Sequence, residues 1–414
     1  MESPNLKICD IVQFYSTLSG GVRRYVHEKI NYLLANANHS HCLIVPSHRD
    51  AVAREERRTI YEIKSPSLIG SNSYRMLINK KKILAALSKE TPDLIEVGDP
   101  YRAAWIGLEG ARQNNIPIVA FYHSDYPRAL DRTLRKYLST RIESIVTPLI
   151  QKYLRKLYNR MSATVVSSRR CHDALDTLGI QNLRTITLGT NLETFKPFGS
   201  RERIFKELGI TESTRLLLFV GRLAREKNIR SLFEMLEILK KDPVPHHLVL
   251  IGDGEWHNEV RIKAREDKNI SWLPFTESPE RLADFYSAAD LFVHAGNCET
   301  FGLVSLEAQA CGTRVLAVRR GGLDESLQYE NPRIMARNPS GKSLAQAVQQ
   351  IWDLGETEIE RGLRRQQMEK HFSWEATFSK LTALYEELAR KEIPAHFTGK
   401  SVIHESEDSA LLSK

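Results

Sequence analysis

Two glutamates, Glu299 and Glu307, stand eight positions apart in the run CETFGLVSLEAQACGTRVLAV. The apolar stretch ADLFVHAGN before them predicts a buried strand that ends in a loop, and VSLEAQACG predicts a helix that ends at Gly312. We therefore expect Glu299 in the loop and Glu307 about two turns into the helix. Because a carboxylate accepts hydrogen bonds from adjacent hydroxyls, the pair could hold two diols, such as the sugar ring and the ribose of a nucleotide sugar.

The turn between the two glutamates contains Phe301, Gly302 and Leu303. At the start of a helix, such a turn presents backbone N–H groups that suit a diphosphate. Two glutamates at this spacing also occur by chance in many helices. The site hypothesis therefore depends on the rest of the chain.

Two cations flank a second loop of the same kind. Arg222 leaves the end of the predicted strand RLLLFVGRL, and Lys227 stands just before the next predicted helix. Two cations at a strand-to-helix loop suit a diphosphate that gains charge as a sugar departs. The alternative is a solvated, charged loop.

Three glycines follow predicted strands. Gly20 and Gly21 open a helix, where a turn without side chains lets backbone N–H groups approach a phosphate; a plain tight turn is the alternative. Gly252, in IGDGE, is a further candidate contact of the donor nucleotide. This run resembles half of a dinucleotide fingerprint, but His257 stands where the third glycine is required, which weakens a nicotinamide or flavin reading.

His123 ends the apolar run IPIVAFYH and precedes Pro127. We expect it at the mouth of a cleft, where histidine can bind hydroxyls or handle protons near neutral pH. A hydrogen-bonded structural histidine is the alternative. Neither an Asp-x-Asp pattern at a strand end nor a His/Cys cluster with metal spacing occurs, so we infer no required metal.

Strand-like runs alternate with helical patterns along the chain, which predicts parallel sheets covered on both faces. The fold class is therefore α/β, with two doubly wound, Rossmann-like domains that face a central cleft. We place the domains at residues 1–192 and 193–373, a last helix at 374–391, and a disordered tail at 392–414. A basic run around residues 72–90 predicts a helix directly after the second strand.

Composition fits a soluble globular protein, with 42% hydrophobic and 27% charged residues among 414. No apolar stretch approaches the roughly 18–20 residues of a membrane span. The start MESPNLKICD lacks the features of a signal peptide, and the five cysteines are scattered like reduced thiols. We expect a cytoplasmic protein.

The positive charge is concentrated in the N-terminal half. Residues 1–190 carry 28 Lys and Arg against 17 Asp and Glu, and residues 128–160 carry nine against two. The latter segment is amphipathic and basic, a pattern typical of contact with anionic lipid at the inner membrane face. The alternative is a helix pair that buries its apolar stripe. No helix-turn-helix, zinc-finger or RNP signature favours nucleic acid. The apolar residues expected to insert into lipid are Leu134, Leu138, Ile142, Leu154 and Leu157.

Taken together, these motifs resemble the retaining glycosyltransferases of family four (group 1), which have the glycosyltransferase B fold. The similar segments occur in the family's order and cover nearly the whole chain apart from the tail. They are GGVRRYVHEKI, AFYHSDYP, FVGRLAREKN, LIGDGE, YSAADLFVHAGNCETFGLVSLEAQACGTRVLAV and FSWEATFSKLTALYEEL.

The resemblance implies a role for each charged motif. Arg222 and Lys227 would bind the donor diphosphate and stabilise the leaving nucleotide, with Gly20 and Gly21 lying against the same phosphates. The last helix, from Trp374, would cross back onto the N-terminal domain.

The resemblance also places the sugar, the ribose and the base. Glu299 would hold hydroxyls of the transferred sugar, Glu307 would bind the ribose diol, and His123 would lie beside the reacting centre. The base would border residues 273–276, which include Phe275. The remaining donor contacts would come from the backbone N–H groups of Phe301, Gly302 and Leu303.

The implied activity is a metal-independent, retaining transfer of a hexose from a UDP- or GDP-sugar. The N-terminal domain would carry the acceptor, a lipid or a lipid-linked glycan. One rival is a nucleotide-sugar epimerase-like enzyme. Another is a catalytically inactive nucleotide-sugar-binding protein, which the intact charged motifs argue against.

Overall fold

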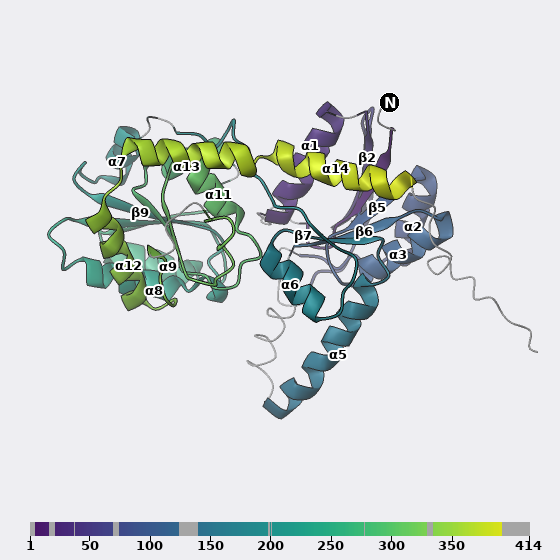
Figure 1. Ribbon diagram of the computed structural model, residues 1–414, viewed down its shortest axis with the longest axis horizontal. Coiled ribbons are helices and arrows are strands. Elements are labelled where there is room, and N and C mark those ends of the chain that lie inside the picture. The colour runs from purple at the N-terminus through teal and green to yellow at the C-terminus, as the bar shows by residue number, and fades with distance from the viewer. Residues whose placement is uncertain are drawn as a thin grey trace, which may run out of the picture.

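The computed structural model forms two α/β domains side by side (Figure 1). Their parallel sheets confirm the predicted doubly wound architecture. Within 140–145 only the backbone is described. The structure describes residues 5–15, 21–36, 38–68, 74–123, 140–197, 199, 201–276, 278–328 and 334–390.

The N-terminal sheet has eight strands in the order β3-β4-β2-β1-β5-β6-β7-β8. All neighbours are parallel except β3, which pairs antiparallel with β4 at the edge. The strands are β1 (Lys7–Ile11), β2 (Ser40–Ser47), β3 (Ala51–Arg54), β4 (Arg58–Lys64), β5 (Leu94–Val97), β6 (Ile118–Tyr122), β7 (Ala163–Val166) and β8 (Leu183–Thr185).

The hairpin of β3 and β4 was missed by the sequence analysis. The helix predicted around residues 72–90 begins only at Lys80, where Asn79 accepts a hydrogen bond from the backbone of Lys82. The run RTIYEIK, which forms β4, mixes β-branched and aromatic residues, which favour strands, with the charged Arg58, Glu62 and Lys64. These charges concealed the strand.

Helices cover both faces of the N-terminal sheet (Figure 1). α1 and α14 pack on one face, and α2, α3, α5 and α6 contribute to the apolar cluster on the other. Their bounds are α1 (Gly21–Asn36), α2 (Lys80–Glu90), α3 (Arg102–Asn114), α5 (Thr140–Tyr158), α6 (Arg169–Thr177) and α14 (Trp374–Arg390).

The C-terminal sheet has five parallel strands in the order β11-β10-β9-β12-β13. Its strand order reverses at β9 and β12, and a doubly wound sheet binds ligands beside such a switch point. The strands are β9 (Arg215–Val220), β10 (His246–Ile251), β11 (Ile270–Leu273), β12 (Leu291–His294) and β13 (Val315–Ala317).

Helices also cover both faces of this sheet. α7, α10, α11 and α13 share the apolar cluster that continues into the N-terminal domain, whereas α8, α9 and α12 cover the other face. Their bounds are α7 (Arg201–Leu208), α8 (Ile229–Leu239), α9 (His257–Glu266), α10 (Pro279–Ala288), α11 (Leu303–Ala310), α12 (Gly341–Leu354) and α13 (Glu358–His371).

The chain crosses back to the N-terminal domain between α13 and α14. There the backbone N–H of Thr190 donates to the carbonyl of Phe372 at 2.8 Å. A Cβ on Gly189 would come within 2.3 Å of the Ser373 carbonyl, so this crossing requires glycine. α14 then packs along α1, as Figure 1 shows.

The basic segment is only partly described. Within α5, Leu154 and Leu157 are buried in the N-terminal core, so the prediction that they insert into lipid is wrong. The helix instead exposes Leu149, at 61%, and Tyr153. No helix in the described part of the chain is long and apolar enough to cross a membrane. Residues 128–139, which include Leu134 and Leu138, the side chain of Ile142, and the tail at 392–414 lie outside the described residues.

A buried ion network fixes α1 to the sheet. Lys29 Nζ on α1 lies 2.8 Å from Asp10 Oδ1 on β1 and 2.6 Å from Glu96 Oε1 on β5. The hydroxyl of Tyr385 on α14 donates to the other Glu96 oxygen. Burial alone would raise the pKa of Asp10, but Lys29 and then His41 lower it to about 2. One buried ammonium thus orients α1, β1, β5 and α14 together.

Lys29→Met is expected to destabilise the fold by about 3–5 kcal/mol, because it leaves two buried carboxyl groups without their cation. The matched control is Lys82→Met, whose ion pair with Asp50 is exposed to solvent and is expected to contribute little to stability. Urea unfolding followed by circular dichroism measures both. Equal, small losses would show that the network does not hold α1.

Candidate active site

The predicted glutamates flank the start of α11. β12 ends at His294, Glu299 lies in the following loop, and α11 begins at Leu303. Glu307 is therefore the fifth residue of the helix, just past one turn rather than about two. The helix starts late because Gly302, with a φ of +84°, caps it in a left-handed conformation. A Cβ at Gly302 would come within 2.0 Å of the Leu323 side chain.

Glu299 is held by two basic groups. Lys227 Nζ forms an ion pair with Glu299 Oε1, and His294 Nε2 lies 3.3 Å from the same oxygen. Burial alone would raise the pKa of Glu299, but Lys227 and then His294 lower it well below its usual range. Glu299 is therefore an anion, and the structure brings it together with Lys227 as a pair.

The loop after β9 places the two predicted cations differently. Lys227 ends the short 3-10 helix η1 (Arg225–Lys227), and the Asn228 side chain donates to the carbonyl of Ala295 at 2.9 Å. This contact ties the loops after β9 and β12 together at the switch point. Arg222 is 63% exposed and pairs with Glu226, so its guanidinium lies at the solvent edge.

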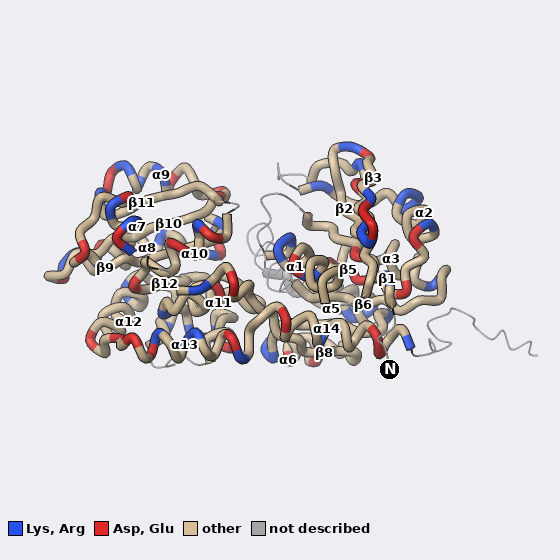
Figure 2. The backbone as a smooth tube through the Cα atoms, turned by 90° about the horizontal axis from the view of Figure 1, so that it is seen from above, with Lys and Arg blue, Asp and Glu red and all other residues tan. Residues whose placement is uncertain are grey.

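Glu307 joins the two domains. Its Oε1 forms an ion pair with Arg24 Nη1 on α1, and its Oε2 accepts a hydrogen bond from the Tyr286 hydroxyl at 3.1 Å. The carboxylate is almost wholly buried. Figure 2 shows α1 and α11 facing each other where the domains meet.

The predicted glycine turn lies at the same junction. A Cβ on Gly21 would lie 3.8 Å from the Leu303 side chain, so the start of α1 lies against the start of α11. Gly20 lies outside the described residues. The side chain of Phe301 is buried in the core, which leaves only its backbone for the predicted contact.

His123 lies beside the Glu299 loop. Its ring stacks on Phe121, with centroids 4.5 Å apart, and its carbonyl accepts a hydrogen bond from the Thr300 hydroxyl at 3.1 Å. Burial, followed by the charge of Lys29, lowers the pKa of His123 to about 3. The imidazole is therefore neutral at physiological pH and can exchange hydrogen bonds, but it does not carry a charge.

Gly252 and Phe275 lie at the same carboxyl edge of the C-terminal sheet. Gly252 has a structural reason to be glycine, because a Cβ there would come within 2.0 Å of the Gly221 carbonyl oxygen. Phe275 follows the edge strand β11 and is partly exposed. Within the described part of the chain, neither residue forms a hydrogen bond or ion pair with Glu299, Lys227 or His294, and both stay candidate donor contacts.

Sequence reasoning missed several residues of this junction. Arg170 Nη1 on α6 donates to the carbonyl of Glu299 at 3.2 Å, and Glu325 accepts from the backbone N–H groups of Arg169 and Arg170. His294 could have been suspected, since it ends a predicted strand five residues before Glu299. The contacts across the domains have no such local signal.

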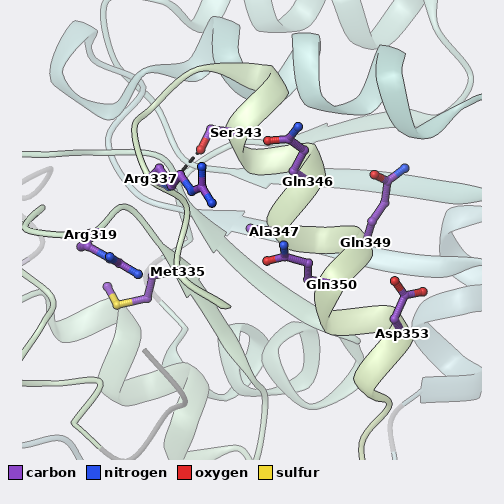
Figure 3. Close-up of a pocket in the computed structure, with 9 residues that line it drawn as sticks. All are labelled: Arg319, Met335, Arg337, Ser343, Gln346, Ala347, Gln349, Gln350 and Asp353. Carbon is purple, nitrogen blue, oxygen red and sulfur yellow. Dashed lines mark hydrogen bonds between the residues drawn. The ribbon is translucent and has the colours of Figure 1, made fainter. Parts of the chain in front are cut away.

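A separate cavity of about 550 Å³ lies within the C-terminal domain, beside α12 (Figure 3). None of its lining residues belongs to the predicted site. The lining residues are Arg319, Met335, Arg337, Ser343, Gln346, Ala347, Gln349, Gln350 and Asp353.

Among the described residues, no group of three or more His, Cys, Asp or Glu side chains could hold a metal.

Known protein families match both domains. Residues 19–194 match Glycosyltransferase Family 4, and residues 200–368 match Glycosyl transferases group 1. A D-inositol 3-phosphate glycosyltransferase of Corynebacterium efficiens is 31% identical over 51% of this chain and 52% of its own length. A GDP-mannose-dependent alpha-(1-6)-phosphatidylinositol dimannoside mannosyltransferase of Mycobacterium tuberculosis is 26% identical over 91% of this chain and 95% of its own.

Solved structures share the architecture. Sucrose-phosphate synthase from Thermosynechococcus elongatus superposes with a TM-score of 0.75 at 22% identity, over 93% of this chain and 99% of that chain. Anabaena HepE, solved with UDP-glucose, gives a TM-score of 0.67 at 16% identity, over 92% and 99%. Two facing parallel-sheet domains of this kind define the glycosyltransferase B fold. The chain belongs to the group 1 glycosyltransferases of family 4.

His294→Phe is expected to lower transferase turnover by about tenfold or more, because Glu299 loses the imidazole nitrogen that lies 3.3 Å from its Oε1 while the aromatic packing is kept. His247→Phe is the matched control, since His247 is a buried histidine at the start of β10, at the opposite end of the sheet from Glu299, and its Nε2 lies 2.8 Å from the Ser271 hydroxyl. Steady-state assays of both variants compare the effects. Equal losses would mean that His294 only supports the sheet.

Proposed function

We propose that this glycosyltransferase transfers a hexose from a UDP- or GDP-sugar with retention of configuration and without a metal. The observation that carries the proposal is the pair of carboxylates at the switch point, Glu307 buried and Glu299 partly buried, each matched by a basic side chain: Glu299 by Lys227, and Glu307 by Arg24. A nucleotide sugar presents two diols and a diphosphate between them, which is the complementary set of groups.

In this proposal each part of the donor has its own partner. Sugar hydroxyls bind Glu299, the ribose diol binds Glu307, and the base lies near Phe275. The diphosphate lies at the start of α11, beside the contact of Gly21 with Leu303 and on the side of Lys227. These fixed positive groups stabilise the charge of the departing nucleotide, which supports a mechanism without a metal.

The transfer itself conserves every atom. The acceptor hydroxyl oxygen bonds to the anomeric carbon from the face that the nucleotide leaves, while the bond to the β-phosphate oxygen breaks. The acceptor proton passes to that phosphate oxygen. Because the pKa of His123 is about 3, this residue serves as a neutral hydrogen-bond partner of the sugar rather than as a general acid.

The names of the relatives favour particular substrates. The relative that aligns over most of the chain is GDP-mannose-dependent and acts on a phosphatidylinositol dimannoside, which supports GDP-mannose and a lipid-linked glycan. The Corynebacterium efficiens relative leaves a soluble inositol phosphate as the second candidate acceptor. Exposed Leu149 and Tyr153 on α5, beside Lys152 and Lys156, favour the lipid acceptor and a peripheral site on the inner membrane face.

The direct experiment is a transfer assay with labelled GDP-mannose and UDP-glucose, against phosphatidylinositol mannosides and inositol phosphate. We expect one donor to give an α-linked product, with the nucleoside diphosphate released. An epimerase-like enzyme would change the donor sugar without transfer, and an inactive binding protein would leave it unchanged. Either result, or a β-linked product, would overturn the proposal.

Substitutions of the two glutamates are expected to have different effects on nucleotide binding and on transfer. Glu307→Gln should weaken binding of the free nucleoside diphosphate by about tenfold or more, because its partner is the ribose. Glu299→Gln should lower transfer by a similar factor while leaving that affinity nearly unchanged, because its partner is the sugar. Calorimetry with GDP and UDP measures the first effect and turnover the second. Equal losses of affinity would contradict this division.

The exposed face of α5 is expected to bind anionic vesicles at low salt and to release them at high salt. Each Lys or Arg near such a surface contributes about 1 kcal/mol, so Lys152→Glu with Lys156→Glu should weaken binding at least about tenfold. Reversing Lys81 and Lys89 on α2 is the matched control. Liposome sedimentation measures vesicle binding of the wild type and of both variants. Wild-type protein in the supernatant at low salt, or an equal loss in the control, would favour a soluble acceptor.

A further inference from the structure

Arg24 forms an ion pair with Glu307, the carboxylate that the proposed function assigns to the ribose. It lies one turn along α1 from Gly21, and its Nη1 pairs with Glu307 Oε1. The other oxygen, Oε2, accepts from Tyr286 on α10. Both oxygens of Glu307 therefore have a protein donor, one from each domain.

Glu307 and its two partners, Tyr286 and Arg24, differ in their exposure to solvent. Tyr286 and Glu307 are buried, and the Glu307 side chain is only 2% exposed. The Arg24 side chain is 27% exposed, and its guanidinium lies 5.6 Å from the ring centroid of Phe195 in the segment that joins the domains. Arg24 is thus the one partner of Glu307 with a path to solvent.

Ribose and Arg24 compete for the same atom. With Arg24 in place, Glu307 is too buried for a hydroxyl to reach Oε1. The Tyr286 hydroxyl lies beside Oε2 and the Arg24 guanidinium beside Oε1, so a cis-diol that binds this buried carboxylate needs the space that the guanidinium fills. Ribose can therefore bind only when the guanidinium moves away.

A second anionic partner lies close to Arg24 along α1. Gly21 lies against Leu303 at the start of α11, where the proposed function places the diphosphate. A guanidinium fork matches phosphate oxygens as well as it matches a carboxylate. An arginine that leaves Glu307 therefore finds a replacement anion supplied by the same donor.

We propose that Arg24 exchanges partners when the donor binds: the ribose diol takes Glu307, and Arg24 moves to the diphosphate. This inference rests on the proposed function. It makes Arg24 a donor-site residue that also links the domains before the donor enters. It further implies that the diphosphate makes ribose binding more favourable, because a phosphate compensates the released guanidinium more strongly than the nearby Glu28 on α1 alone.

The exchange predicts effects of opposite sign on two ligands. Arg24→Met should weaken binding of GDP or UDP by about ten- to a hundredfold, since a charge-assisted contact is lost. The same change should tighten binding of the uncharged nucleoside, guanosine or uridine, by at least about threefold, since a partly exposed competing ion pair is removed. Calorimetry measures the diphosphate, and competition against it measures the nucleoside.

Two further variants make the test specific. Arg23→Met removes the same charge from the same turn of α1, but Arg23 contacts Tyr15, so both affinities should stay within about twofold. Arg24→Lys keeps the charge and replaces Arg24→Met in the test if the methionine variant does not fold. The lysine variant should lose less diphosphate affinity than the methionine variant. If the methionine variant cannot be measured, the lysine variant should lose less than about tenfold.

The possible outcomes distinguish a failure of the Arg24 exchange from a failure of the proposed function. If wild-type protein binds the diphosphate but Arg24→Met weakens nucleoside and diphosphate in parallel, or changes neither, the exchange is wrong while the proposed donor site stands. A lysine variant that loses tenfold or more diphosphate affinity would also overturn it. If the wild type binds neither GDP nor UDP, the proposed function fails and the exchange fails with it.

Discussion

Two carboxylates at the meeting point of two domains, Glu307 buried and Glu299 partly buried, require positive partners, and the candidate site is built around this requirement. A buried charge without a partner is strongly unfavourable, and before a ligand binds Lys227 stabilises Glu299 and Arg24 stabilises Glu307. One partner comes from a neighbouring loop and the other from the opposite domain. The same electrostatics that stabilises the folded protein therefore prepares a site for a ligand of mixed charge.

Hydrogen bonds and ion pairs in both domains hold the elements that carry these charged groups. The switch point between β9 and β12 brings their two loops together, and the side chain of Asn228 ties them to each other. On the other side, Lys29 anchors α1 to two strands and, through Glu96, to α14. α1 thus presents Arg24 from a helix held by a buried network, while α14 connects that helix to the C-terminal half of the chain.

Local patterns were enough to predict most of this arrangement. Apolar runs identified the strands of both sheets except β3 and β4, and the E-x7-E spacing placed Glu299 in a loop before a helix. The hairpin of β3 and β4 was missed because charged residues interrupt its short apolar runs. The insertion of Leu154 was wrong because an amphipathic pattern does not show which face is buried. The partners Arg24 and Arg170 could not be predicted, since they depend on how the two domains pack against each other.

The most direct measurement is a crystal structure with a non-hydrolysable UDP- or GDP-sugar analogue. The account predicts the diphosphate at the start of α11 beside Lys227, the sugar hydroxyls on Glu299 and the ribose diol on Glu307, with Arg24 moved to a phosphate oxygen. A nucleotide bound elsewhere, such as the cavity beside α12 in Figure 3, with the Lys227–Glu299 and Arg24–Glu307 pairs intact, would contradict it.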